Sequence, residues 1–446
     1  MILAVILFVV GYVFIAFEAP LKVDKSATAL LLAVSIWVFY IYAGEDVFAF
    51  TGFVENFTNF KATSPDSSFF DFVSRHELMN NLGSIAEILF FLMGAMTIVE
   101  TIDHHNGFAI LTNKITTNNK RKLLWILTIM TFFLSATLDN LTTTIVMCAL
   151  LRKLIAKRKD RWLFAAMIVL AANCGGAWSP IGDVTSIMLW MGGQITAPVL
   201  MLKTLVPCLV SLLVPLAIVS SRMKGNFERP VNTIIGNYEV SGRVRNLVLL
   251  MGIGGLLFVP VFKTITHLPP FVGMLFSLSM LWFVTSRLHH RYSERSFSCA
   301  KILEKIDTSS ILFFLGILLA VAGLQSMGYL SMLATGLTQI FDGDFYKMNL
   351  CIGMLSAVID NVPLLAGTIG MYPLSVYPTD HSFWLFLSYC VGSGGNMLII
   401  SSAAGVAAMG MEKIEFMWYL KKISLWALIG FLSGAGTFIL LNTFVF

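Results

Sequence analysis

The sequence has little charge and little histidine. Of its 446 residues only 12% are Asp, Glu, Lys or Arg and 57% are hydrophobic, whereas soluble domains carry about 25% charged residues. The seven His residues lie in loops or near the ends of apolar runs, which leaves no ligands for a haem or an intramembrane metal. The six cysteines have no metal-ligand spacing, and we expect them to be small buried hydrophobic residues. No segment is polar enough to form a soluble domain.

Apolar runs fill the chain instead. A helix needs roughly 20 apolar residues to cross the hydrocarbon of a bilayer. The predicted spans are 2–17, 27–43, 83–102, 162–192, 199–221, 244–262, 268–286, 309–330, 382–411 and 423–445. The first has neither a basic leader nor a cleavage site of small residues, so we expect a transmembrane helix rather than a signal peptide. The sequence therefore predicts an all-α polytopic membrane protein.

Two further apolar runs, 123–151 and 347–372, do not fit as simple spans. Lys and Arg collect in cytoplasmic loops, and both flanks of the first run are basic. We therefore predict that 123–151 is a re-entrant hairpin from the cytoplasmic side, with Asp139 and Asn140 at its turn. The flanks of 347–372 are mainly acidic, which predicts a hairpin from the outer side. This topology places most Lys and Arg in the cytoplasm, and the acidic loop 44–82 and both chain termini outside.

Three landmarks occur twice in the same order: a Phe-Phe-Leu triplet, an Asp-Asn pair and a Gly-Gly pair. In the first half they begin 49 and then 36 residues apart, at Phe90, Asp139 and Gly175. In the second half they begin 47 and then 34 residues apart, at Phe313, Asp360 and Gly394. The sequences around the Asp-Asn pairs also match, as SATLDNLTTT and SAVIDNVPLL. The agreement in order and spacing predicts an internal repeat.

The predicted repeats are residues 1–223 and 244–446, joined by a cytoplasmic linker, 224–243. Each holds five spans and one hairpin, and because five is odd the second repeat must be inverted. Inverted repeats with a site between them at the midplane are typical of secondary transporters.

The Gly-Gly pairs lie inside two long spans, 162–192 and 382–411. Glycine loosens a helix, and Pro180 removes a backbone donor from the first span, so we predict that both helices are interrupted near the midplane. Glycines that only let helices pack closely are the alternative.

The ionisable residues at membrane depth are all acidic: Glu87, Asp139, Asp183 and Asp360. No Lys or Arg is expected at comparable depth, so a cavity lined by these acids would attract a cation. Hard cations prefer oxygen ligands, which neighbouring neutral side chains also offer. The candidate ion-binding residues are Asp139, Asn140, Thr142, Thr143, Asn173, Asp183, Asp360, Asn361, Ser393 and Asn396. Helix N-capping is the structural alternative for Asp139, Asp183 and Asp360.

Four motifs resemble the NhaD-type sodium/proton antiporters of the ion transporter superfamily. They are DNLTTTIVM (139–147), AANCGGAWSPIGDVTS (171–186), SAVIDNVPLLAG (356–367) and GGNMLIISSAAGVAAMG (394–410). The resemblance implies exchange of cytoplasmic Na⁺ or Li⁺ for external H⁺, in the inner (plasma) membrane of a bacterium. It marks Asp139, Asn140, Thr142, Asp183, Asp360 and Asn361 as the ion-handling residues. Asn396, where the family has a small hydroxyl residue, and Cys174, where it has alanine, depart from the pattern.

The expected function is therefore transport rather than catalysis, with Na⁺ or Li⁺ and H⁺ competing for membrane-embedded carboxylates, above all Asp139 and Asp360. No cofactor and no nucleic-acid partner is expected, and a homodimer is left open.

Two other functions fit parts of the pattern. A sodium-coupled carboxylate or anion symporter of the same fold would carry uncharged residues at the hairpin turns, where this chain has Asp139 and Asp360. An intramembrane aspartyl protease would need a Tyr-Asp and a Gly-x-Gly-Asp motif, neither of which is present, and would not explain the repeat.

The topology makes a direct prediction. Cysteines introduced as Lys122→Cys and Lys153→Cys should both react with an impermeant thiol reagent added from the cytoplasmic side. Labelling from opposite sides would make 123–151 an ordinary span and would remove the argument for inversion.

Overall fold

The computed structural model describes residues 2–16, 23–51, 55–107, 115, 117–227, 241–292 and 299–445. Most of the predicted linker 224–243 lies outside these ranges. Within them the secondary structure is helical, apart from one isolated bridge between Asn119 and Asn226.

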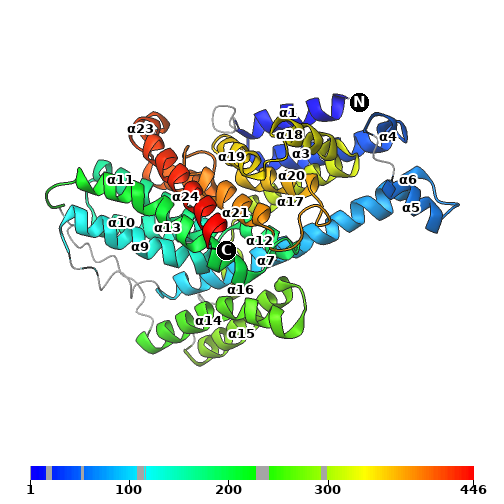
Figure 1. Ribbon diagram of the computed structural model, residues 1–446. Helices are drawn as coiled ribbons and strands as arrows, with labels where there is room; N and C mark the ends of the chain where they lie inside the picture. The colour runs from blue at the N-terminus through cyan, green and yellow to red at the C-terminus, as the bar shows by residue number, and fades with distance from the viewer. Residues whose placement is uncertain are drawn as a thin grey trace. The chain divides into compact units, whose positions relative to one another are not determined.

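The helices of the first half of the chain are α1 (Ile2–Ala16), α3 (Lys25–Ala43), α4 (Asp46–Thr51), α5 (Glu55–Thr63), α6 (Phe69–Asp71), the π-helix η1 (Phe72–Glu77), α7 (Leu78–His104), α9 (Lys120–Leu138), α10 (Asn140–Leu154), α11 (Arg158–Ala177), α12 (Val184–Met191) and α13 (Ala197–Ser221). Those of the second half are α14 (Gly242–Thr266), α15 (Pro270–Tyr292), α16 (Cys299–Leu303), α17 (Thr308–Ser326), α18 (Tyr329–Ile340), α19 (Phe345–Leu355), α20 (Asn361–Met371), α21 (Ser382–Gly394), α22 (Ala403–Glu412), α23 (Phe416–Lys422) and α24 (Ser424–Phe444). Figure 1 labels the helices along the chain.

Eight helical stretches of the described residues are long and apolar enough to cross a membrane, by length and composition. Large apolar side chains such as Leu31, Leu202 and Leu250 are exposed on these stretches, as expected for helices that face lipid. The prediction of an all-α polytopic membrane protein is therefore confirmed.

Two compact units divide the described chain. The first, unit 1, comprises Met1–Leu92, Asp307–Met348 and Val362–Tyr377, and the second, unit 2, comprises Met93–Ile306, Asn349–Asn361 and Pro378–Phe446. Each unit combines segments from both halves of the sequence, so this division is a different one from the predicted repeats 1–223 and 244–446. The repeat boundaries stay a prediction.

In unit 1, α3 packs along α17, and α1 packs against α3. The indole Nε1 of Trp37 donates to the carbonyl of Leu319 at 2.9 Å, which ties the two long helices together. Asp24 caps the start of α3, and the Ser26 backbone N–H that it accepts holds the pKa of the Asp24 carboxyl below its usual range.

Residues 44–82 differ from the sequence prediction, which treated them as an acidic loop. The described part forms α4, α5, α6 and the π-helix η1. The aromatic rings of Phe48, Phe57, Phe69 and Phe72 lie with centroids 5.1–6.5 Å apart. These aromatic contacts order a segment whose overall acidity suggested a solvated loop, because ring pairs add stabilisation beyond the area they bury.

In unit 2, α9 packs on α11, α10 packs on both α11 and α22, and α13 packs along α24. The two spans predicted to be interrupted are interrupted. Helix α11 ends at Ala177 and α12 begins at Val184, while α21 ends at Gly394 and α22 begins at Ala403. Asp183 and Ser402 cap the second helix of each pair.

Each segment predicted to be a re-entrant hairpin contains two helices, and α9, the first helix of segment 123–151, is itself long and apolar enough to cross a membrane. Helices α9 and α10 contain 19 and 15 residues and meet at Asp139, whereas α19 and α20 contain 11 residues each. Their placement relative to a bilayer stays a prediction.

Two glycines allow close approach between helices. A Cβ on Gly175 would lie 2.2 Å from the carbonyl oxygen of Phe132 in α9, and a Cβ on Gly394 would lie 2.2 Å from that of Gly353 in α19. Phe132 stands seven residues before Asp139, and Gly353 stands seven residues before Asp360. The same contact therefore occurs at the same position relative to each Asp-Asn pair.

Two serines make matching hydrogen bonds beside these glycines. Ser135 Oγ donates to the Ala172 carbonyl at 2.6 Å, and Ser356 Oγ donates to the Val391 carbonyl at 3.0 Å. Each serine stands four residues before its aspartate, and each acceptor three residues before its Gly-Gly pair.

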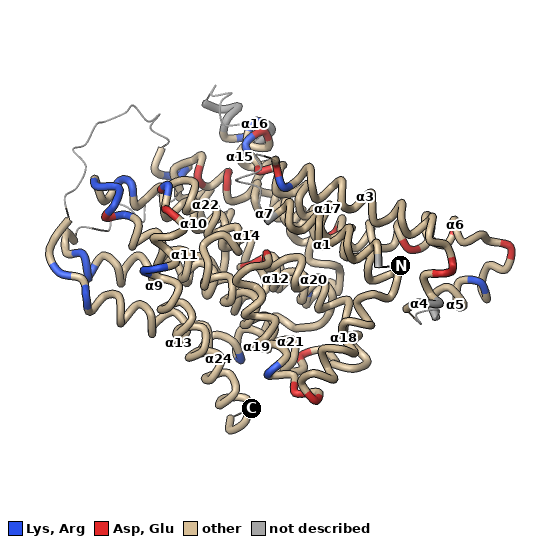
Figure 2. Tube along the Cα trace, turned by 90° about the horizontal axis from the view of Figure 1, so that it is seen from above, with Lys and Arg blue, Asp and Glu red and all other residues tan. Residues whose placement is uncertain are grey.

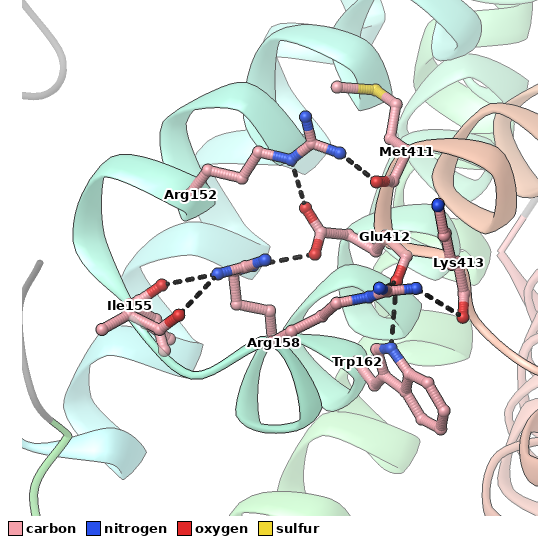
Figure 3. Close-up of polar contacts among 9 residues, drawn as sticks. Arg152, Ile155, Arg158, Trp162, Met411, Glu412 and Lys413 are labelled. Atoms are coloured by element: carbon pink, nitrogen blue, oxygen red, sulfur yellow. Dashed lines mark hydrogen bonds and ion pairs between the residues drawn. The ribbon is translucent and has the colours of Figure 1, made fainter.

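A buried ion pair joins α22 to α10 and α11 (Figure 3). The Glu412 carboxylate is fully buried, and it accepts from Arg152 Nε at 2.7 Å and from Arg161 Nε at 2.8 Å. Arg158 Nε and Trp162 Nε1 donate to the Glu412 carbonyl. One acidic residue therefore ties the end of α22 to both helices that flank the α10–α11 turn.

Removing this charge tests its structural role. Glu412→Gln keeps the shape but leaves Arg161, whose side chain is only 13% exposed, without a counter-charge. Breaking a buried pair lowers the free energy of unfolding by about 3–5 kcal/mol. Because Arg152 is half-exposed, the loss of stability should lie toward the lower end of this range. Thermal unfolding of the purified protein in detergent measures it, with the exposed Glu415→Gln as control. Equal melting temperatures for the two variants would show that the pair contributes nothing to stability.

Candidate functional site

Asp139 lies at the turn between α9 and α10. Its Oδ1 accepts from the Thr142 backbone N–H at 2.8 Å, and its Oδ2 accepts from Thr142 Oγ1 at 2.7 Å. The carboxylate is therefore held by a capping interaction and remains partly exposed.

The backbone of Asp139 is unusual, with φ of 69° and ψ of 158°. This region is essentially reserved for glycine, and other residues there carry about 1–3 kcal/mol of strain. Such strain persists only where the surrounding structure enforces it, and it is concentrated at functional sites.

A chain of buried amides runs from this turn into the two interrupted helices. Asn140 Nδ2 donates to Asn173 Oδ1 at 3.1 Å. Asn173 Nδ2 in turn donates to Asn396 Oδ1 and to Ser402 Oγ, both at 3.0 Å. These four side chains are at most 5% exposed. Asn173 therefore connects the turn between α9 and α10 with the interruption between α21 and α22.

Asp183 is buried at the interruption between α11 and α12. Its Oδ1 accepts weakly from the Thr185 N–H at 3.4 Å, whereas its Oδ2 is buried without a hydrogen-bond partner among the described residues. The charges of Asp139 and Asp360 both act on Asp183. The structure thus brings all three predicted aspartates into one region of unit 2.

The second Asp-Asn pair lies just before and at the start of α20. Asp360 is partly exposed, whereas Asn361 is 4% exposed and its Oδ1 accepts from Ser356 Oγ at 2.5 Å. A Cβ on Gly395 would lie 2.9 Å from Asn361 Oδ1. This pair therefore lies against the second interruption, and Asn140 is connected to the same interruption through Asn173.

Two other candidate ion-binding residues, Thr143 and Ser393, are not part of the amide chain. Thr143 is fully buried in α10, and its Oγ1 has no hydrogen-bond partner in the described part of the chain. Ser393 donates to the Tyr389 carbonyl within α21 and takes no part in the amide chain.

Two residues that bond to the amide chain, Ser402 and Tyr419, were not predicted from the sequence. Ser402 accepts from Asn173, and the Tyr419 hydroxyl donates to the Asn396 carbonyl at 2.8 Å. The repeat could have identified Ser402, which stands seven residues after Gly395 as Asp183 stands seven residues after Gly176. Tyr419 has no comparable signal.

The two departures from the family pattern contact each other. Asn396 Nδ2 lies 3.3 Å from Cys174 Sγ, and Cys174 Sγ lies 3.7 Å from Ser211 Oγ. The departures therefore form one local change in packing beside the amide chain.

The charges and polar atoms around Asp139 and Asp183 indicate which kind of ligand the region suits. Neither Asp139 nor Asp183 pairs with Lys or Arg in the part of the chain that the structure describes. No three His, Cys, Asp or Glu side chains converge there as ligands of a resident metal would. Carboxylate, amide and hydroxyl oxygens are present in this region, and oxygen atoms are the ligands that hard cations prefer.

Known proteins that resemble this chain are membrane transporters. Residues 12–392 match the family model CitMHS, described as citrate transporter. The chain is 42% identical to "Sodium/proton antiporter 2" of Arabidopsis thaliana, over 98% of this chain and 99% of that protein. "Sodium/proton antiporter 1" of the same plant is also 42% identical, over 99% of this chain and 72% of that protein. The "Na(+)/H(+) antiporter NhaD" of Alkalimonas amylolytica is 29% identical, over 99% of this chain and 90% of that protein.

The fold and these relatives define a polytopic membrane transporter rather than an enzyme, as the sequence predicted. The chain belongs to the citrate transporter family, and its resemblance to NhaD-type antiporters is confirmed.

The hydrogen bonds of the amide chain predict that substitution of Asn173 lowers the stability of the protein. Asn173→Ala would leave Asn140, Asn396 and Ser402 without a shared partner, and an orphaned buried polar group costs about 1–3 kcal/mol. We expect a lower melting temperature in detergent than for Asn59→Ala, a substitution of an exposed asparagine. A melting temperature unchanged from wild type would mean that water or rearrangement replaces these bonds.

Proposed function

We propose that this protein exchanges Na⁺, or Li⁺, for H⁺ across a membrane, and that the three aspartates of unit 2 carry the exchange. The buried and unpartnered Oδ2 of Asp183, which experiences the charges of Asp139 and Asp360, is the observation that carries the proposal. The charges of these three acids concentrate negative potential, which a proton or a small cation can neutralise.

Asp139, Asp183 and Asp360 would act as alternative binding sites for the ion and the proton. A carboxylate that binds Na⁺ cannot hold a proton at the same oxygen, so binding of one releases the other. Asn140, Thr142 and Asn361 would supply further polar atoms at the two turns, and Asn173, Asn396 and Ser402 would fix the interrupted helices around them. No separate proton carrier is needed for the exchange itself.

The matching contacts around Gly175 and Gly394 support an internal repeat. The glycine contacts and the serine hydrogen bonds recur at equivalent positions in the two halves of the chain. We propose that the repeats are inverted, that 123–151 and 347–372 are re-entrant hairpins, and that the interruptions lie at the midplane.

The distribution of charge supports the orientation. In Figure 2, Lys and Arg of unit 2 gather near α9, α10 and α11, where Lys120–Lys122 and Arg152–Arg161 flank the first hairpin. Because such residues collect in the cytoplasm, we propose that this end faces the cytoplasm and that the membrane is the plasma membrane. Na⁺ would then leave the cytoplasm as H⁺ enters.

The family description raises citrate as a second substrate class. A tricarboxylate would have to approach Asp139 and Asp183, neither of which pairs with a Lys or Arg among the described residues. Counterflow of labelled citrate and succinate distinguishes the two functions, and rapid counterflow of either would replace the proposal of Na⁺/H⁺ exchange by anion transport.

Direct competition predicts a particular pH dependence. Below the pKa of the shared carboxylate, each unit fall in pH should raise the KM for Na⁺ about tenfold per competing proton. The maximal rate at saturating Na⁺ should change little. The measurement is a Na⁺ titration of exchange in proteoliposomes, with equal pH on both faces. A constant KM with a collapsing maximal rate would instead indicate a regulatory proton at another site.

Neutralising the acids tests the site itself. Asp139→Asn keeps the side-chain size and the capping oxygen but removes the charge, so exchange should disappear while the protein still folds. Asp360→Asn should also reduce exchange at least about tenfold, the loss expected when a charged interaction of about 1.4 kcal/mol is removed. Asp160→Asn, which removes a carboxylate paired with Lys120 outside the site, is the matched control. Normal Na⁺ transport by both site variants would refute the assignment.

A further inference from the structure

Helix α23 of unit 2 exposes large apolar side chains. Phe416, Met417 and Leu420 are 36%, 55% and 39% exposed. In a helix with 3.6 residues per turn, positions 416, 417 and 420 fall on one side. Tyr419 is fully buried on the other side. This short helix therefore has one face packed against unit 2 and one apolar face that the described part of the chain leaves exposed.

Contacts with α11 hold α23 and the turn before it in place. The rings of Trp162 and Trp418 meet edge to face, with centroids 5.3 Å apart. Arg158 Nε donates to the Glu412 carbonyl at 2.9 Å, and Arg158 Nη2 donates to the Lys413 carbonyl at 3.5 Å (Figure 3). Helix α23 also packs on α24. The start of α11, the turn between α22 and α23, and α23 itself therefore form one continuous surface.

Basic side chains are exposed on this surface and form no ion pair in the described part of the chain. They are Arg158, Lys159, Lys413, Lys421 and Lys422, which we call the basic group. A helix of seven residues is only about 10 Å long, so the two lysines that end α23 stand close to the turn at its start.

Few acidic side chains balance the basic group. Glu412 is buried in the ion pair described above, and Asp160 pairs with Lys120. The remaining acid of these segments, Glu415, is exposed. One exposed carboxylate therefore stands against five exposed cations, and the surface carries an excess of positive charge.

Two indole rings accompany the basic group. Trp418 lies within α23, and Trp426 stands four residues after Lys422, near the start of α24. The Arg222 guanidinium at the end of α13 lies 4.7 Å from the centroid of the Trp426 ring. Tryptophan is enriched where a membrane meets water. Apolar side chains, indoles and cations on one short helix are typical of a segment that lies among lipid headgroups.

We propose that this surface binds the headgroup of an anionic phospholipid. The basic group would bind the lipid phosphate, and the acyl chains would cover Phe416, Met417 and Leu420. The excess positive charge favours an anionic lipid over phosphatidylcholine, whose headgroup has no net charge, and the apolar face favours a lipid over a soluble phosphate. The bound lipid would join the end of α22 to the α10–α11 turn. Binding requires neither transport nor a particular orientation in the membrane.

The general preference of Lys and Arg for one side of a membrane predicts a different result. Cations that serve only to orient the chain would attract anionic lipids equally wherever they are exposed. Arg121, Lys122 and Lys224 provide the comparison, because they are exposed on other segments of unit 2. We call these three the comparison residues.

The first readout is native mass spectrometry of the purified protein with added dioleoylphosphatidylglycerol or dioleoylphosphatidylcholine. A Lys near a membrane surface strengthens binding to anionic lipid about fivefold. Lys413→Gln, Lys421→Gln and Lys422→Gln combined should therefore weaken phosphatidylglycerol binding at least about tenfold. Replacing all three comparison residues by Gln should weaken it less than about twofold. An equal loss in both combinations, or equal binding of the two lipids to wild type, would overturn the proposal.

The second readout separates a lipid from other occupants of the surface. Phosphatidylglycerol should raise the melting temperature of the wild-type protein in detergent, whereas sn-glycerol 3-phosphate at the same concentration should not. Met417→Gln combined with Leu420→Gln keeps the basic group but should weaken phosphatidylglycerol binding at least about threefold, because apolar contact area is lost. Equal stabilisation by both compounds would replace the lipid by a soluble phosphate. Conversion of a dimer to a monomer by this double variant, measured by light scattering, would make a second copy of the chain the occupant instead.

Discussion

The polar interior of unit 2 depends on backbone contact between helices. Where Gly175 meets the Phe132 carbonyl and Gly394 meets the Gly353 carbonyl, a single methyl group would push the helices apart. The approach allows Ser135 and Ser356 to bond backbone carbonyls of the opposite helices. It also brings the first Asp-Asn pair within reach of Asn173, and a wider separation would replace these direct hydrogen bonds with water.

The buried acidic side chains differ in whether a basic side chain pairs with them. Glu412 has two guanidinium partners and further donors to its carbonyl, so its charge is matched permanently and serves to hold α22 in place. Asp183 has only a neutral hydrogen-bond donor among the described residues. Neither Lys nor Arg pairs with it in that part of the chain, and under the proposed function a transported cation or a proton balances its charge.

The sequence predicted the parts of the site that follow from local pattern. The all-helical membrane fold and the two interruptions follow from apolar run length and glycine pairs, and membrane depth and repeated spacing selected Asp139, Asp183 and Asp360 as candidates. Contacts between distant segments could not be predicted in this way. The bonds from Asn173 to Asn396 and Ser402 join residues more than 200 positions apart, and the ion pair of Glu412 depends on how α22 meets the α10–α11 turn. The helices within 44–82 were missed because their order comes from aromatic packing, which net acidity does not reveal.

The strained backbone of Asp139 has an evolutionary consequence. Its φ and ψ lie in a region that glycine adopts readily and that residues with a side chain adopt only under strain. Glycine at this position would relieve the strain, but the bonds to the Thr142 N–H and hydroxyl that cap α10 would be lost with the carboxylate. Under the proposed function, relief of strain and retention of the transporting carboxylate therefore oppose each other at one residue. Glutamate would suffer the same backbone strain, and its longer side chain would lose the short capping geometry. The cap, together with the strained backbone, therefore favours aspartate over glutamate at this turn.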